Sequence, residues 1–329
     1  MTQIALTPFA TVRMRSIRTV AFFVFSLLPF AIQAQPATVP VSIAGQPDCR
    51  RVPAFTTKTG IDTRRGAFST SDMPKVGLVY KEIRLANDPP AEPSAKPKIY
   101  QHPSWMKYGH MGPMVIDQDG FIYLAPIPFV NTLKNPSKKQ NVIYRIDPNT
   151  GLMTSYLTLP MTSEPGPQNP YGVLGMGYDC NTKMLYVSSV YGSDRKNVRG
   201  RIYAIKTGTA PQIVDEIKEI DAFGMGIFLL NGKRKLLYGE ARSTELYMVE
   251  LKEDGRFAGK PEWMLSLDGI GIRGDDRARK VRVAENGDLT VSGIEFYFNL
   301  IAPTERQETP YTFRYDAQQS KWVLIRIGG

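Results

Sequence analysis

Few residues of this chain combine a reactive side chain with a position that suggests a site. His110 follows a glycine within the segment 108–123, and Asp275 and Asp276 are adjacent in the sequence RGDDR. An imidazole near carboxylates can serve as a general base or as a metal ligand. His110 and Asp276 are therefore the candidate catalytic residues, with Asp275 beside them.

Glu240 and Arg242 form a second group of charged residues, separated by one alanine. Opposite charges so close to each other at the end of a predicted strand indicate an ion pair before an acid–base couple. The sequence contains neither a G-x-S-x-G nucleophile elbow nor an H-E-x-x-H zinc motif. It therefore lacks the signatures of those two classes of hydrolase.

Three stretches of the chain repeat one local pattern: an aromatic residue, then glycine, then a tyrosine fifteen positions after the aromatic residue. They are YGHMGPMVIDQDGFIY at 108–123, YGVLGMGYDCNTKMLY at 171–186 and FGMGIFLLNGKRKLLY at 223–238. The pattern recurs at intervals of 63 and 52 residues. Such recurrence is typical of repeat architectures.

Each unit contains four short segments of strand character, separated by turn residues such as Asp119-Gly120, Asn231-Gly232 and Asn286-Gly287. No convincing amphipathic helix interrupts them. The predicted strands are 114–117, 121–125, 142–147 and 154–159, then 174–178, 184–189, 201–206 and 213–217, then 226–230, 235–240, 245–251 and 262–267, then 280–284, 288–293, 311–316 and 321–327.

Four-stranded antiparallel units predict an all-β fold, a single β-propeller of four-stranded blades. A β-sandwich is the alternative, but it does not explain an aromatic-glycine pair at every fourth strand. Five blades are countable, and they begin near Gly66, Gly109, Gly172, Gly224 and Arg277. The long connections between second and third strands, at 126–140, 191–200 and 295–310, are expected at one mouth of the axial channel.

The N-terminal region predicts export. Residues 1–34 combine Arg15 and Arg18 with an apolar run and a terminal alanine, as in a secretory signal peptide. Residues 35–65 contain four prolines between 36 and 53 and are expected to form an extended arm, followed by the propeller domain at 66–329. A periplasmic or extracellular protein with no membrane span after signal cleavage is expected.

Charge and cysteine content fit that interpretation. The 41 basic residues include three within 1–34, so 38 remain against 31 acidic ones, and a balance of +7 with mixed signs does not favour nucleic-acid binding. Cys49 and Cys180 are the two cysteines. In an oxidising compartment they either form a disulfide or remain as two buried thiols.

The aromatic residues that open the innermost strands are expected to meet at the mouth. With the charged residues above they form the predicted ligand-binding set: Tyr108, Tyr171, Phe223, Asp275, Asp276, Glu240 and Arg242. These rings either line a pocket for a flat or sugar-like ligand or plug the channel as core. Cations in the long connections favour an anionic ligand, unless they are simply solvated; they are Lys134, Lys138, Lys139, Arg195, Lys196 and Arg199.

The sequence LLYGEARSTELYMVELKEDGRFAGKPEWMLSLDGIGIRGDDRARKVRVAENGDLTVSG resembles the gluconolactonase and strictosidine-synthase-like superfamily, with the best match over 223–293. The resemblance implies six blades and, in the hydrolases, an axial calcium ion held by residues that open innermost strands. Those positions here are Tyr108, Tyr171, Phe223 and Asp275 or Asp276, of which only the aspartates bind metal. A rebuilt calcium site would use Asn169, Asp221, Asp275 and Asp276.

Three functions follow from these patterns. The first is an exported propeller that binds a small molecule or a protein at the mouth without turnover and without a cofactor. The second, implied by the resemblance, is a calcium-dependent lactone or ester hydrolase. The third is a structural module that interacts through its outer edges. The fold by itself does not choose among them.

Overall fold

The computed structural model describes residues 41–70, 75–85, 88, 96–128, 136–161, 169–298 and 307–328, all within the compact unit Pro40–Gly329. The predicted signal peptide at 1–34 lies outside the described residues. None of the helices in the described part of the chain has the length and hydropathy needed to cross a membrane.

The described chain folds into five antiparallel sheets. They are β2 (Gly66–Ser69), β3 (Val79–Glu82) and β4 (Ile99–Tyr100); β5 (Met111–Ile116), β6 (Ile122–Pro126), β7 (Val142–Ile146) and β8 (Met153–Thr158); β9 (Val173–Asp179), β10 (Met184–Ser189), β11 (Arg201–Lys206) and β12 (Gln212–Lys218); β13 (Ala222–Leu230), β14 (Lys233–Glu240), β15 (Glu245–Leu251) and β16 (Phe257–Ser266); and β17 (Arg277–Val283), β18 (Leu289–Ile294), β19 (Thr309–Asp316) and β20 (Lys321–Ile327). The short strand β1 (Ile43–Gly45) and three short 3-10 helices, η1 (Ala54–Lys58), η2 (Pro103–Met106) and η3 (Ser137–Lys139), complete the described elements.

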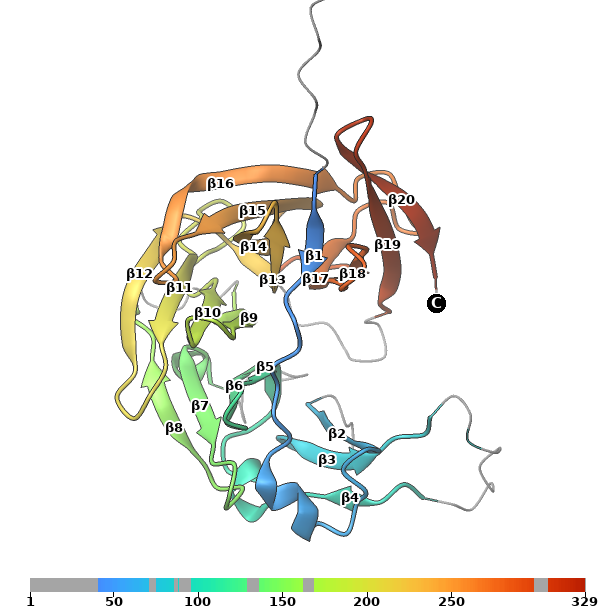
Figure 1. Cartoon of the computed structure of the whole chain (residues 1–329). Helices are drawn as coiled ribbons and strands as arrows, with labels where there is room; N and C mark the ends of the chain where they lie inside the picture. The colour runs from blue at the N-terminus through green and yellow to red at the C-terminus, as the bar shows by residue number, and fades with distance from the viewer. Residues whose placement is uncertain are drawn as a thin grey trace, which may run out of the picture. The chain divides into compact units, whose positions relative to one another are not determined.

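The sheets are the blades of a β-propeller, which confirms the predicted fold class (Figure 1). The innermost strands β5, β9, β13 and β17 contact one another in chain order. Hydrophobic clusters fill the spaces between successive blades, as each sheet needs a neighbour to cover its apolar face. The five countable blades are confirmed. The sixth blade implied by the resemblance is not found in the described residues, and the first blade has three strands instead of four.

The three inner strands of the last blade, β17, β18 and β19, alternate buried and exposed side chains over part of their length, as expected for strands with one face on the core. In β18, Leu289 and Val291 are buried while Thr290 between them is exposed. The innermost strand β9 is instead buried along its whole length because blades cover both its faces. At Gly175 a β-carbon would lie 1.9 Å from the carbonyl oxygen of Phe223, so only glycine allows β9 and β13 to approach so closely.

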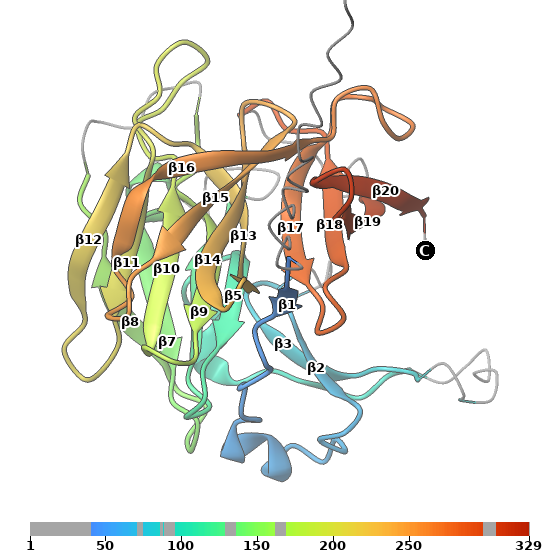
Figure 2. The same cartoon turned by 45° about the horizontal axis from the view of Figure 1, so that its top comes forward.

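The arm after residue 40 is more structured than the sequence predicted. Its residues Ile43–Gly45 form β1, which pairs antiparallel with the end of β13 and makes that sheet five-stranded. Figure 2 shows β1 near the ends of β13 and β17. We call residues 42–55 the N-terminal strap. The backbone N–H of Gly45 donates to the carbonyl oxygen of Ala284 at 2.8 Å, and that of Arg51 donates to the backbone carbonyl oxygen of Asp117 at 3.1 Å. The strap thereby joins several blades at the end opposite the long connections.

Cys49 and Cys180 form a disulfide with their Cα atoms 6.1 Å apart. Cys180 lies in the turn between β9 and β10, so the bond fastens the strap to the third blade. The disulfide prediction is confirmed, and two free thiols are excluded.

Candidate functional site

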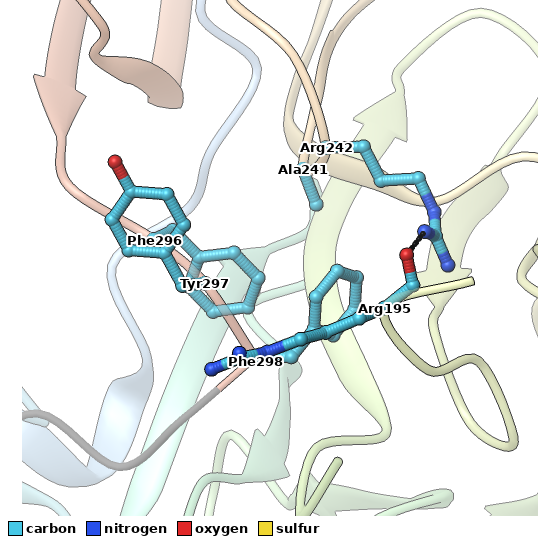
Figure 3. A pocket seen from close by; sticks show the side chains of 6 residues that line it. All are labelled: Arg195, Ala241, Arg242, Phe296, Tyr297 and Phe298. Atoms are coloured by element: carbon cyan, nitrogen blue, oxygen red, sulfur yellow. Dashed lines mark hydrogen bonds between the residues drawn. The ribbon is translucent and has the colours of Figure 1, made fainter. Parts of the chain in front are cut away.

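A cavity of about 380 Å³ opens at the mouth formed by the connections β10–β11 and β14–β15 and by residues 296–298, the described start of the β18–β19 connection. These are second-to-third-strand connections of three successive blades, as the sequence predicted for the mouth. Six residues line the cavity, and Figure 3 shows them: Arg195, Ala241, Arg242, Phe296, Tyr297 and Phe298. Its volume lies at the lower end of the roughly 300–1,000 Å³ usual for ligand pockets.

Phe296 is the centre of the aromatic cluster at this mouth. Its ring centroid lies 5.1 Å from that of Tyr171, 4.8 Å from that of Phe223 and 5.2 Å from that of Phe298. Tyr171 and Phe223 are only 2% and 4% exposed, and neither lines the cavity. The structure therefore brings two of the predicted aromatic residues together as support beneath the cavity, in the manner of the plug alternative.

Tyr108 lies elsewhere in the propeller. Its ring centroid is 4.4 Å from that of Tyr144, at the edge of the hydrophobic cluster between the first two blades. Gly109 has a φ of 83°, so the chain turns sharply before β5 begins at Met111. Tyr108 thus precedes the strand and packs on its own blade instead of joining Tyr171 and Phe223.

The residues that do line the cavity were not singled out by the sequence analysis, apart from Arg195 and Arg242. Phe296, Tyr297 and Phe298 lie at the start of the connection 295–308, directly after β18. Three consecutive aromatic residues next to a long connection are the signal that would have found them. Phe298 has a φ of 61°, which is strained for a bulky residue and is often associated with functional positions.

Arg242 holds the β10–β11 connection in place. Its Nε donates to the carboxylate of Asp221, and its guanidinium also donates to the backbone carbonyl oxygens of Asp194, Arg195 and Asn197. The guanidinium carbon lies 5.1 Å from the ring centroid of Phe298. Arg242 therefore links three elements of the mouth.

Asp221 is fully buried beneath this arginine. Its Oδ1 accepts from Ser193 Oγ at 2.5 Å and from the backbone N–H of Gly200 at 3.1 Å. Burial raises the pKa of Asp221, while the hydrogen bonds from Ser193 and Arg242 lower it. The carboxylate is thus a structural anchor of the β10–β11 connection.

The predicted ion pair between Glu240 and Arg242 is not formed. Glu240 instead accepts a hydrogen bond from Ser243 Oγ at 2.5 Å, while Arg242 pairs with Asp221. Side chains two residues apart lie on the same side of a strand only while the strand continues. Because β14 ends at Glu240, Arg242 lies beyond the strand and is free to extend in another direction.

The two adjacent aspartates have different environments. Asp276 is fully buried, where it pairs with Arg273 at 2.5 Å and accepts from the hydroxyl of Tyr311 at 2.7 Å. The side chain of Asp275 is 42% exposed and accepts from the hydroxyl of Tyr297. That hydrogen bond raises the pKa of Tyr297. His110 is on another blade, one residue before β5.

Three of the four residues proposed for a rebuilt calcium site, Asn169, Asp221 and Asp276, direct their oxygens to protein donors in this arrangement. Asn169 donates its amide to the carbonyls of Val190 and Ser193, and its oxygen accepts from the backbone N–H of Tyr171 at 2.9 Å. Asp221 and Asp276 direct their oxygens to arginines. Within the described ranges, no three His, Cys, Asp or Glu residues are grouped as metal ligands.

No family model matches the chain, and no curated protein matches it. Solved structures resemble it at low identity. A functionally unknown protein from Desulfotomaculum acetoxidans is 12% identical over 87% of this chain and 69% of its own, with a TM-score of 0.43. A glucose dehydrogenase is 17% identical over 74% and 76%, with a TM-score of 0.40. An α-L-arabinofuranosidase from Lactobacillus brevis is 14% identical over 75% and 86%, with a TM-score of 0.43.

Proposed function

We propose that this protein is an exported β-propeller that binds a small ligand, of about monosaccharide size, at its aromatic mouth without turnover. The observation that carries the proposal is the cavity of about 380 Å³ between Arg195, Arg242 and the aromatic residues 296–298. Flat apolar walls with few polar groups are typical of small-molecule sites. Phenylalanine and tyrosine rings suit the face of a sugar or of an aromatic ring.

Contacts within the protein fix three of the side chains that line the cavity in the absence of a ligand. Phe298 packs on Phe296 and under the guanidinium of Arg242, which is itself bound to buried Asp221. Side chains fixed in this way lose little conformational freedom on binding, and this preserves affinity. The strained backbone of Phe298 is consistent with a wall residue kept in place for function.

The environment of the two buried aspartates at this end of the propeller favours a binding protein over an enzyme. Asp221 and Asp276 are buried and paired with arginines, and His110 is on a different blade from either of them. A general base needs a free lone pair within hydrogen-bond reach of the substrate. These two aspartates direct their oxygens into the protein framework instead.

Export is part of the proposal. The disulfide between Cys49 and Cys180 favours an oxidising compartment, and the sequence of residues 1–34 predicts a signal peptide. A mature chain that begins at Gln35, measured by intact mass after expression with the leader, is the expected product. An uncleaved chain retained in the cytoplasm would contradict export.

Replacing Phe298 with alanine tests the site. Calorimetric titration with four probes, glucuronate, glucose, benzoate and benzyl alcohol, is expected to give measurable binding for at least one. Phe298→Ala should then weaken that binding by about tenfold or more, because a buried ring contributes roughly 1.5–3 kcal/mol. Trp263→Ala is the control, since this tryptophan is 60% exposed on the outer strand β16.

Binding by none of the probes, or equal loss in both variants, would contradict the proposed site and favour interactions through the outer edges.

Metal analysis of the purified protein tests the alternative function, a calcium-dependent lactone or ester hydrolase. One tightly held calcium per chain, with lactone hydrolysis that stops in chelator, would replace binding by catalysis as the function.

A further inference from the structure

Arg195 differs from the other charged residues of the mouth. It is exposed, and among the described residues its side chain has no hydrogen bond or ion pair. In Figure 3 the side chain extends across the cavity toward the aromatic residues of the β18–β19 connection. A guanidinium in this position is available to a bound ligand.

The backbone of Arg195 is fixed although its side chain is not engaged. Its carbonyl oxygen accepts from Arg242 Nη1 at 3.3 Å, and the carbonyls of Asp194 and Asn197 accept from the same arginine. The backbone N–H of Arg199 donates to Ser193 Oγ at 2.9 Å, which ties the other end of the connection to Asp221. These hydrogen bonds fix the backbone of the connection so that the side chain of Arg195 lies at the cavity.

Among the described residues, none of the carboxylates of the mouth forms an ion pair with Arg195. Asp221 and Asp276 are paired with Arg242 and Arg273. Asp194 accepts from the side-chain amide of Asn197 at 2.9 Å and from the backbone N–H of Lys196 at 2.7 Å. The hydrogen bond from Asn197 lowers the pKa of Asp194 to about 2. The positive charge of Arg195 therefore faces the aromatic cavity without a described counter-ion.

Resting on the proposed function, the geometry points to a ring-shaped carboxylate as the ligand, with its carboxylate on Arg195 and its ring against Phe296 and Phe298. A planar guanidinium matches a carboxylate with two parallel hydrogen bonds. One uncommitted arginine suits a single negative charge, and the adjacent rings suit a pyranose or an aryl body. A sugar acid and an aromatic acid share this chemistry.

The test compares the protein with two variants against matched probes. Glucuronate and glucose form one pair, and benzoate and benzyl alcohol form the other; each pair differs chiefly in the carboxylate. We expect the protein to prefer the charged member of at least one pair. Arg195→Gln should weaken the carboxylate by about 10- to 100-fold, with the neutral member changed less than threefold. Lys196→Gln, an exposed neighbour that does not line the cavity, should keep the preference.

Each outcome decides the inference. The pair that shows the preference identifies the body of the ligand as a sugar or an aryl ring. Equal binding of charged and neutral probes would overturn the carboxylate assignment while the proposed function stands. Equal loss for both members in Arg195→Gln, or the same loss in Lys196→Gln, would overturn the role of Arg195. Failure of every probe to bind would remove the proposed function together with the inference.

Thermal unfolding provides the folding control for these variants. Because the Arg195 side chain has no hydrogen bond or ion pair among the described residues, Arg195→Gln should unfold within a few degrees of the unaltered protein. A large decrease would mean that the side chain supports the mouth instead of the ligand, and would also overturn the assignment.

Discussion

Replacing Cys49 and Cys180 together with serine is expected to lower the free energy of unfolding by about 2–5 kcal/mol. The disulfide spans 131 residues, so its loss frees a long loop in the unfolded chain. It also releases the N-terminal strap, whose β1 pairs with β13. For a chain of this size the expected decrease in the unfolding temperature is roughly 5–15 °C.

The measurement is thermal unfolding with and without reductant. Reductant should destabilise the unaltered protein by the same amount as the double substitution, and it should not change the double variant. Binding at the mouth should be retained at temperatures where both are folded, because the strap crosses the opposite end of the blades. An unfolding temperature that does not change, after alkylation proves both thiols free, would contradict the stabilising role of the bond.

Arg234→Met is expected to cost about 3–5 kcal/mol because it leaves a buried carboxylate without its cation. Arg234 pairs with Asp179, whose side chain is fully buried, and its own side chain is only 14% exposed. Its Nη2 also donates to the carbonyls of Lys252 at 2.8 Å and Glu253 at 2.9 Å. The pair thus ties the β9–β10 turn of one blade to the β14 and β15 ends of the next.

Lys233→Met is the matched control for this prediction. Its ammonium pairs with Glu250 at 3.1 Å, but the lysine side chain is 66% exposed, so the loss should be below about 1 kcal/mol. Urea unfolding of both variants makes the comparison. Asp179→Asn combined with Arg234→Met should recover part of the loss, because the buried charge is then removed. Equal effects at positions 233 and 234 would show that burial of the pair does not matter.

The strand positions were predictable because the residue types and turns that determine them lie close together in the sequence. In β10, β11 and β15 the predicted and observed bounds coincide, since short runs rich in β-branched, aromatic and other apolar residues end at polar turn residues. Gly120 and Gly287 have φ values of 86° and 85°, as the predicted Asp-Gly and Asn-Gly turns require. The strand β1 was missed because three residues between Pro40 and Pro47 carry no period.

The candidate site was only partly predictable because its contacts join different blades. Sequence spacing placed Tyr171 and Phe223 at one mouth, and they do lie against Phe296. The same spacing did not place Tyr108, whose ring packs on Tyr144. The ion-pair partners of charged side chains were least predictable, because they depend on contacts between distant parts of the chain. Arg242 pairs with the buried Asp221, 21 residues away in sequence, and not with Glu240.

By itself the sequence determined that this chain forms β-blades and how many are countable, because alternation and turn chemistry act between near neighbours. The sequence also supplied the two cysteines, with a bond as one of two expected states. Only the tertiary structure decided which aromatic side chains reach the mouth and which support it. The tertiary structure also decided that Arg242 pairs with Asp221, whereas the side chain of Arg195 has no hydrogen-bond or ion-pair partner among the described residues. The physical reason is that packing between blades sets these distances, and packing depends on residues far apart in the chain.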